Sequence, residues 1–252
     1  MASKQASSSQ TGRDPQAFLP QRYARQSFSP ELWQRFSEAA AALGLSFSAE
    51  QKLRLEALYS HLLGVNAWLN LTRLSSPEEY LILHVLDSLT ALELCKKHSR
   101  PGDLLLDLGS GAGYPGLPLA MHMTDRKFLL LDSRRKKAEF LKHTIALLPE
   151  AQLQALCFRG REVARHCPEI RHACTVLTAR AVGAAAELLL DAEQLLKPGG
   201  HLLLLKGPKF LQEENEQFEQ ACQKLGFKPE LAAPVRLPEL GQERYLVLAK
   251  KL

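Results

Sequence analysis

The sequence lacks the features that mark membrane proteins, secreted proteins and cysteine-based metal centres. No apolar run approaches the roughly 20 residues that a helix needs to cross a bilayer. The opening segment MASKQASSSQTGRDPQ has no apolar stretch of the kind found in secretory signals, so we expect a cytoplasmic protein without a membrane partner. The 5 cysteines stand at irregular spacing without a C-x-x-C pair, which favours free thiols in a reducing compartment. We therefore expect no bound metal.

The composition that is present fits a globular protein. Hydrophobic residues make up 46% of the 252 residues and charged residues 23%. The 32 Lys and Arg residues outnumber the 27 Asp and Glu residues, giving a formal net charge of +5. This excess suits an anionic partner such as nucleic acid, but it also occurs in many proteins that have none. The length suits one α/β domain with a helical appendage.

The N-terminal part divides into a tail and a helical region. Residues 1–28 are rich in Ser and Gln and show little periodic hydrophobicity, which predicts a mobile tail. Residues 29–99 contain three helical patterns, each preceded by a serine that can cap the first turn: Ser29, Ser48 and Ser76. We expect these residues to form a helical subdomain.

From residue 100 onwards, short leucine-rich or β-branched runs alternate with helical segments, a pattern typical of a parallel sheet covered on both faces. The last two runs, GFKPELAAPVRL and ERYLVLAKKL, have no helix between them and predict a hairpin with one antiparallel strand. We expect residues 100–252 to form a Rossmann-like α/β core. The five strands expected before the hairpin cover 103–107, 126–131, 152–157, 174–178 and 201–206.

A glycine-rich turn follows the first predicted strand in DLLLDLGSGAGYPGLPLA, residues 103–120. Its GAGYPG matches the dinucleotide pattern G-x-G-x-x-G, which is weak evidence alone. Asp107, two residues before Gly109, would repel a pyrophosphate but suits a ligand that carries an ammonium group. A sheet that ends in a hairpin also offers no second mononucleotide-binding half. Both features favour S-adenosylmethionine over NAD, although the glycines also suit a plain tight turn.

Further cofactor contacts are expected around this turn. Asp132 ends the second strand about 20 residues beyond Gly111, where an acidic side chain can accept the two ribose hydroxyls. The alternative for Asp132 is a carboxylate at a helix N-terminus. Tyr114, in the glycine turn, is expected to contribute to the same site. After the third strand, FRGREVAR would place Glu162 and Val163 beside the adenine.

Six segments together resemble a known family: NLTRLSSPEEYLILHVLDSL, DLGSGAGYPGLPLA, LLDSRRKKAEFLK, TARAV, LLLLKG and GQERYLVLAKK. In this order, over about residues 55–251, they resemble the bacterial 16S rRNA methyltransferase G family, also called glucose-inhibited division protein B. The resemblance implies a class I S-adenosylmethionine-dependent methyltransferase with a seven-stranded, mostly parallel sheet. It also implies transfer of a methyl group to N7 of one guanine in 16S rRNA, with the rRNA or the 30S ribosomal subunit as partner. We expect a monomer.

One departure from the family concerns the adenine contact. The family usually reads G-R-A-E-E after the third strand, whereas this chain has G-R-E-V-A at 160–164, which moves the acid by one position. The residue that would contact the adenine is therefore left open between Glu162 and its neighbours.

Three basic residues stand at ends of the predicted strands. Arg180 follows the fourth strand, Lys206 ends the fifth and Arg244 begins the last, so we expect them to converge beside the methyl group as an RNA clamp. Each alone could be a solvated surface charge. Arg180 is expected to contact guanine O6, a phosphate or the cofactor carboxylate, and Arg180→Ala to leave the fold intact while abolishing methylation.

The expected reaction needs no general base, because guanine N7 already carries an in-plane lone pair. The chain also lacks the N/D-P-P-Y/F tetrad of adenine-N6 enzymes and a Pro-Cys pair for attack on pyrimidines. His84 and Asp87 lie one helical turn apart. They either close the helical subdomain onto the sheet or, as the resemblance implies, stand at the cofactor mouth.

Three other functions stay open at this point. The chain could act on a small molecule, or it could bind RNA with this fold but without catalysis. An NAD oxidoreductase is the third alternative. Calorimetry with S-adenosylhomocysteine and with NAD would discriminate among them.

Overall fold

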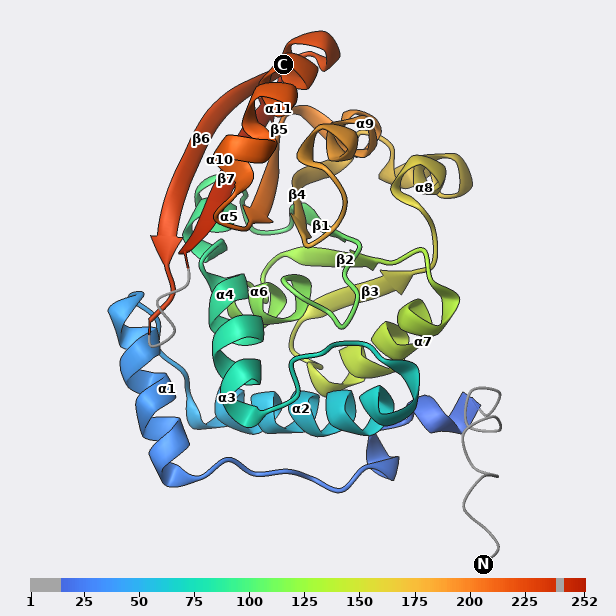
Figure 1. The fold of residues 1–252 in the computed structure, drawn as a ribbon. Helices are drawn as coiled ribbons and strands as arrows, with labels where there is room; N and C mark the ends of the chain where they lie inside the picture. The colour runs from blue at the N-terminus through green and yellow to red at the C-terminus, as the bar shows by residue number, and fades with distance from the viewer. Residues whose placement is uncertain (1–14, 239–242) are drawn as a thin grey trace, which may run out of the picture.

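The computed structural model describes residues 15–238 and 243–252 (Figure 1). Within them one seven-stranded sheet has the order β3-β2-β1-β4-β5-β7-β6. β7 is antiparallel to β5 and β6, and the other pairs are parallel, which confirms the expected fold class. The strands are β1 (Leu104–Leu108), β2 (Lys127–Leu131), β3 (Gln152–Leu156), β4 (Cys174–Arg180), β5 (Leu196–Lys206), β6 (Phe227–Arg236) and β7 (Glu243–Lys251).

Helices precede the sheet and connect its strands. The N-terminal ones are η1 (Pro15–Phe18), η2 (Pro20–Arg22), α1 (Pro30–Ala42), α2 (Ala49–Leu69), α3 (Pro77–Glu79), η3 (Tyr80–Leu86), α4 (Asp87–Leu89) and α5 (Leu92–Lys97). The connecting ones are α6 (Gly116–His122), α7 (Arg135–Thr144), η4 (Ile145–Leu147), α8 (Gly160–His166), η5 (Pro168–Ile170), α9 (Ala185–Leu195), α10 (Phe210–Glu213) and α11 (Asn215–Leu225).

Strand side chains alternate between two hydrophobic cores. Leu105 of β1 joins a core shared with the N-terminal helices, α6 and α7, whereas Leu106 and Leu108 join a core shared with α8, α9 and α11. We call these two sides of the sheet the first and the second face. Because successive residues of a strand point to opposite faces, this alternation fixes the face on which each functional side chain lies.

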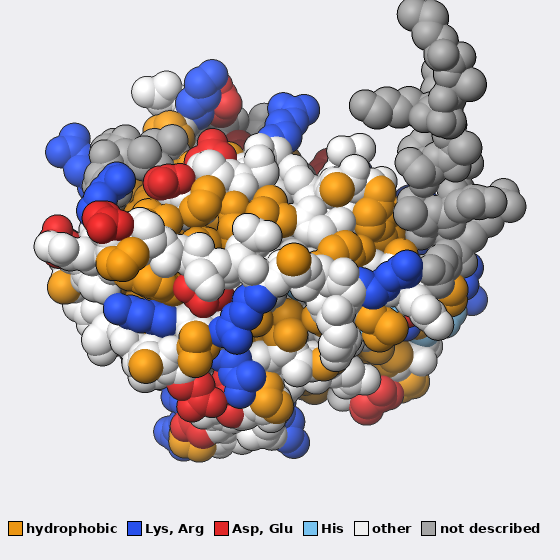
Figure 2. All heavy atoms as spheres, turned by 90° about the horizontal axis from the view of Figure 1, so that it is seen from below, with side chains coloured by type: hydrophobic (Ala, Val, Ile, Leu, Met, Phe, Trp, Pro, Cys, Tyr) orange, Lys and Arg blue, Asp and Glu red, His pale blue; other side chains and the backbone are white. Residues whose placement is uncertain are grey.

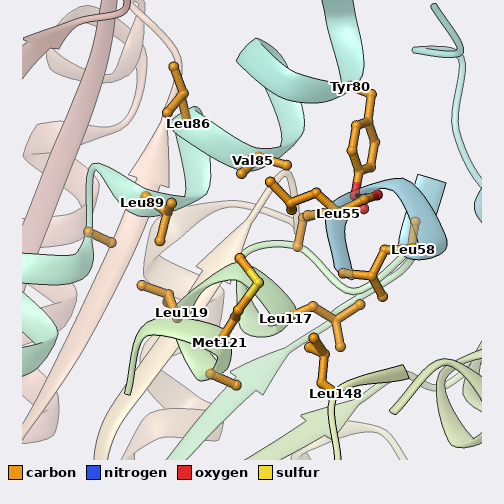
Figure 3. Packing of buried hydrophobic residues seen from close by; sticks show 14 of the residues in the cluster. Leu55, Leu58, Tyr80, Val85, Leu86, Leu89, Leu117, Leu119, Met121 and Leu148 are labelled. Carbon is orange, nitrogen blue, oxygen red and sulfur yellow. Dashed lines mark hydrogen bonds between the residues drawn. The ribbon is translucent and has the colours of Figure 1, made fainter. Parts of the chain in front are cut away.

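The N-terminal helices and the sheet share the first core. Figure 3 shows Leu55 of α2, Val85 of η3 and Leu117 of α6 among the side chains that meet in it. Each is fully buried, and burying a leucine or valine side chain contributes about 1.5–3 kcal/mol. The helical residues before residue 100 and the sheet after it therefore share one continuous hydrophobic core.

The tail prediction for residues 1–28 is wrong for its described part, residues 15–28. Phe18 is 5% exposed and Phe28 is 7% exposed, and both belong to the first core. Polar bonds also hold the segment, because Phe28 N donates to Glu56 Oε1 at 3.0 Å. Phe18 and Phe28 lie too far apart in the sequence to form a periodic pattern, so their burial could not be predicted from it. Residues 1–14 lie outside the described residues.

Two further expectations need correction. The third expected helix has a π-helical stretch, η3, between α3 and α4, and a turn separates α4 from α5. π-helical stretches are rare and frequently occur at functional sites. The fifth strand, expected at 201–206, already begins at Leu196, because Leu196 pairs with Cys174 of β4.

Figure 2 shows the molecule from the side on which α2 lies in Figure 1. On this face, positive, negative and hydrophobic side chains are interspersed. In the described part of the chain, no helix combines the length and the apolarity that spanning a membrane requires.

Candidate functional site

The glycine-rich loop connects β1 to α6 at the carboxyl edge of the sheet. Gly109 has a φ of 69°, and a Cβ there would lie 2.5 Å from Val182 Cγ2. Gly111 N donates to Asp132 Oδ2 at 3.0 Å, and Arg134 N donates to Asp132 Oδ1 at 2.8 Å. Asp132 thus fixes the loop and the approach to α7, while a carboxylate has further lone pairs for ribose hydroxyls. Its ribose contact stays a prediction.

Asp107 lies beneath this loop. Its side chain faces α6, where Oδ2 accepts from Gly116 N at 3.0 Å and Oδ1 accepts from Thr178 Oγ1 at 3.1 Å. The residue is 1% exposed, and burial raises the pKa of its carboxyl to about 6. The two carboxylate oxygens therefore connect Asp107 to the first residue of α6 and to β4. The expected contact with an ammonium group stays a prediction.

A cavity of about 530 Å³ opens beside the loop, on the second face. Its volume lies within the range of roughly 300–1,000 Å³ typical of small-molecule sites. Among the expected cofactor residues, Gly109 and Glu162 line it. Val163 does not, because its side chain is 0% exposed and its N donates to Arg159 O. The lining comprises Leu108, Gly109, Leu131, Ser133, Phe158, Arg159, Gly160, Arg161, Glu162, Val182, Glu187 and Asp191.

Asp191 of α9 also lines this cavity, and nothing in the sequence indicated it as a site residue. Its Oδ1 is buried and has no hydrogen-bond partner among the described residues, with Arg161 Nε 3.7 Å away. Burial raises the pKa of this carboxyl. A Cβ on Gly160 would lie 2.5 Å from Asp191 Cγ, so the glycine makes room for the carboxylate. An acceptor left without a donor costs about 1–3 kcal/mol, which a donor on a ligand would recover.

A second polar group, which we call the Asp87 cluster, lies on the first face and comprises His84, Asp87, Arg180 and Arg244. Asp87 Oδ2 accepts from Arg180 Nη1 at 3.0 Å, and its Oδ1 accepts from Arg244 Nε at 3.2 Å. The carboxylate is 3% exposed. Since Arg180 also donates to Leu83 O at 2.8 Å, the cluster ties η3 and α4 to β4 and β7.

His84 completes this cluster. Arg180 Nη2 lies 3.0 Å from His84 Nδ1, and a guanidinium can only donate, so Nδ1 accepts and the proton belongs on Nε2, which donates to Thr72 Oγ1 at 3.0 Å. Burial, and then the charge of Arg180, lower the pKa of His84 to about 3. The ring stacks on Tyr114 with centroids 4.4 Å apart. These contacts show that His84 and Asp87 close the helices onto the sheet, which is one of the two alternatives for this pair.

Tyr114 is 4% exposed and lies beneath the Asp87 cluster rather than in the cavity lining. Arg180 lies over its ring, with Cζ 5.6 Å from the centroid. Tyr114 therefore supports Arg180, and its expected contact with the cofactor stays a prediction.

The expected convergence of three cations is wrong. Arg180 and Arg244 meet at Asp87 on the first face, but Lys206 lies on the second face, where its Nζ pairs with Glu214 Oε2 at 2.8 Å and donates to Gly183 O at 3.0 Å. The reason is strand alternation: Leu205 belongs to the first core, so its neighbour points the other way.

The network around Arg180 also changes the expectation for its removal. Arg180→Ala would leave Asp87 buried with one of its two cations gone, so we no longer expect the stability of the fold to be unaffected.

Comparisons with known proteins bear on what this edge of the sheet does. A family model described as rRNA small subunit methyltransferase G matches residues 51–240. The chain is 34% identical over 217 residues to ribosomal RNA small subunit methyltransferase G of Lachnoclostridium phytofermentans, covering 86% of this chain and 88% of that protein. It is also 34% identical over 224 residues to the protein of the same name from Pelotomaculum thermopropionicum, covering 88% and 91%.

Solved structures with a similar fold include other methyltransferases. A SAM-dependent methyltransferase from Aquifex aeolicus has a TM-score of 0.52 and 14% identity, over 73% of this chain and 97% of that one. Geranyl diphosphate C-methyltransferase from Streptomyces coelicolor A3(2) has a TM-score of 0.51 and 16% identity, over 72% and 90%. At these identities the likeness shows the fold alone.

Proposed function

Because the chain belongs to the rRNA small subunit methyltransferase G family, we propose that it transfers a methyl group from S-adenosylmethionine to N7 of one guanine in 16S rRNA. The observation that supports this most is the coincidence of the family match with an open cavity beside the glycine loop. We place the reaction in the cytoplasm, on the rRNA or the 30S subunit, with the chain acting as a monomer. Light scattering of the purified chain tests the last point.

The cavity residues fit the adenosine part of S-adenosylmethionine. No residue in the described ranges donates a hydrogen bond to Asp191 Oδ1, and the adenine amino group could supply that donor. Gly109 lines the same cavity and leaves no room for a side chain, so the backbone can approach a ligand closely. Asp132 would hold the ribose hydroxyls, and Glu162 borders the space for the base. When bound, S-adenosylmethionine supplies a methyl group activated by its sulfonium.

The chain's own contribution to the reaction is positioning. Guanine N7 needs no deprotonation before methylation, so holding the base in line with the methyl group and excluding water suffices. His84 is not placed to act as a base, because its Nδ1 accepts from Arg180 and its Nε2 donates to Thr72. The base would enter at the carboxyl edge of the sheet, next to the Asp87 cluster.

The Asp87 cluster supplies positive charge for the RNA. Asp87 holds the guanidinium groups of Arg180 and Arg244 at this edge of the sheet, and the lowered pKa of His84 keeps that ring neutral near pH 7. Such charge attracts the phosphate backbone without reading its sequence. We propose that Arg180 and Arg244 position the RNA in this way.

The test is methylation of 30S subunits or 16S rRNA from cells that lack this protein. The purified chain with labelled S-adenosylmethionine should add one methyl group per 16S rRNA, and mass mapping should find it as 7-methylguanine. Incorporation into no rRNA, or into a base other than guanine, would contradict the proposal.

A matched pair of glycine variants serves as the control. Gly109→Ala and Gly44→Ala both place a side chain at a positive φ, 69° and 72°, and this conformation costs each about 1–2 kcal/mol of stability. Gly109→Ala in addition brings its Cβ to 2.5 Å from Val182 Cγ2, so the thermal stability of both variants is measured alongside methylation. Only Gly109 lines the cavity, and a Cβ on Gly44 meets nothing within 4 Å. Gly109→Ala should lose methylation, and Gly44→Ala should keep it.

A further inference from the structure

Three residues that are distant in the sequence form a cluster away from the carboxyl edge of the sheet: His98, His201 and Glu230. One potential ligand atom from each lies within 4.8 Å of the others. His98 follows α5, His201 lies within β5 and Glu230 belongs to β6. His201 stands five residues before the end of β5, about 16 Å along the strand from Lys206. The cluster is therefore separate from the proposed methylation site.

Each of the two imidazole rings has one nitrogen to which no described residue is hydrogen-bonded. His98 Nε2 and His201 Nδ1 are both buried and have no hydrogen-bond partner among the described residues. The ring centroids lie 3.9 Å apart, and His201 Nε2 is 3.3 Å from Glu230 Oε2. Burial lowers the pKa of each histidine, so both rings are neutral near pH 7 and have lone pairs to offer.

A β-bulge aims the carboxylate at these rings. In the β6–β7 pair, Pro229 is opposite Ala249 and Leu231 is opposite Leu248, so Glu230 is the extra residue. Bulges commonly redirect a side chain at the edge of a sheet. The side chain of Glu230 is 28% exposed, so its oxygens can still move.

We propose that His98, His201 and Glu230 bind a divalent transition-metal ion of the Zn²⁺ class. Two imidazole nitrogens and one carboxylate oxygen are a ligand set that Zn²⁺ takes, and such a set leaves a fourth position for water. Ligand atoms around one tetrahedral Zn²⁺ lie roughly 3.4 Å apart, so the three groups need to approach by about 1 Å. Mg²⁺ prefers oxygen ligands and is not expected to bind.

The expected role of the ion is to fasten the edge hairpin to α5. β6 lies at the edge of the sheet, paired only to β7 among the described strands, so a metal bridge from α5 and β5 would hold it in place. The charges of Lys97 and Lys250 face His98 and oppose a cation. We therefore expect weaker binding than in a zinc site free of neighbouring cations.

The test is calorimetry of the full chain after chelator treatment, with ZnSO₄ and MgSO₄ as titrants. We expect one equivalent of Zn²⁺, no Mg²⁺, and a higher melting temperature with Zn²⁺. His98→Gln should remove the binding. Glu230→Gln should weaken it at least tenfold, and since this side chain is partly exposed the variant should fold. Co²⁺ should show the visible absorption of a tetrahedral site in the wild type only.

A histidine outside the cluster is the matched control. His122 Nε2 is also buried and has no hydrogen-bond partner within residues 15–238 and 243–252, but His122 is not part of the cluster, so His122→Gln should bind Zn²⁺ as the wild type does. No binding by the wild type overturns the proposal. So does equal binding by the wild type, His98→Gln and Glu230→Gln, which would place the ion elsewhere, for instance on the free cysteines. Neither result bears on methylation.

Discussion

The two polar sites at the carboxyl edge of the sheet differ in how completely their charges are paired. In the Asp87 cluster, both carboxylate oxygens of Asp87 accept from arginines, and both nitrogens of His84 have partners. In the cavity on the second face, Asp191 Oδ1 is buried, and no described residue donates a hydrogen bond to it. Both carboxylates lie at the same edge of one sheet, on opposite faces of it.

This difference separates a cluster that holds elements of the fold together from a cavity that can take up a ligand. A buried charge with all its partners is stable as it stands and holds elements together, whereas a buried acceptor without a donor is satisfied only by something that binds. The Asp87 cluster therefore fixes the helical layer on the sheet and presents its arginines. The cavity is the place where we propose that the nucleoside binds. Removing one partner at a time tests this assignment.

The largest expected effect comes from Asp87→Ala. It leaves Arg180 partly buried without its carboxylate, and breaking a buried pair in this way costs about 3–5 kcal/mol of unfolding free energy. Urea denaturation followed by tryptophan fluorescence measures it, with Glu93→Ala as the control because the ion pair between Glu93 and Lys96 is exposed. If the two variants lose the same small amount of unfolding free energy, the Asp87 cluster does not hold the helices on the sheet.

A double-mutant cycle between Asp87 and Arg180 should show a smaller coupling. We expect about 2 kcal/mol between Asp87→Ala and Arg180→Ala, because contacting groups in one network are not additive. The same cycle between Asp87 and Lys206 should give a coupling near zero, since Lys206 lies on the other face and pairs with Glu214. Equal couplings would mean that the three cations act together after all.

His84→Gln should change how stability depends on pH. With a folded pKa of about 3 and an ordinary value of 6.5, the unfolded chain binds a proton below pH 6.5 that the folded chain does not. Stability is therefore full above pH 6.5 and falls as the pH drops, by at most about 1.4 kcal/mol per unit. Glutamine can accept from Arg180 and donate to Thr72 without titrating, so the variant should show a shallower slope.

Denaturation between about pH 5 and pH 7.5 measures that slope. The raised pKa of Asp107 acts in the opposite direction, since its protonated form is favoured in the folded state, but it is present in both proteins and cancels in the comparison. His166→Gln, at an exposed position, is the control and should follow the wild type. Identical slopes for the wild type and His84→Gln would show that the ring titrates normally.

The sequence alone was sufficient where function depends on local spacing. The strand that ends at Asp107, the glycines after it and the strand that ends before Asp132 are close in sequence, so their arrangement around one loop could be predicted. The hairpin at the C-terminus was also recognisable, because no helical pattern separates its strands. These features fixed the fold class and the kind of ligand.

The site residues that could not be predicted from the sequence depend on contacts between distant segments. Asp191 lies in an ordinary helical pattern, and only its meeting with Gly160 makes it a cavity residue. The ligands proposed for the metal ion stand at positions 98, 201 and 230, far beyond any motif spacing. The face on which Lys206 lies, by contrast, follows from the alternation of side chains along β5 and is therefore predictable from the sequence.

Binding of S-adenosylhomocysteine by calorimetry, compared between the wild type and Asp191→Asn, tests the central claim most directly. The claim is that the cavity with the unsatisfied carboxylate holds the adenosine. We predict one equivalent bound by the wild type, and affinity lower by about tenfold in Asp191→Asn, which is worth about 1.4 kcal/mol. A wild type that binds NAD but no S-adenosylhomocysteine, or an Asp191→Asn variant that binds with unchanged affinity, would contradict it.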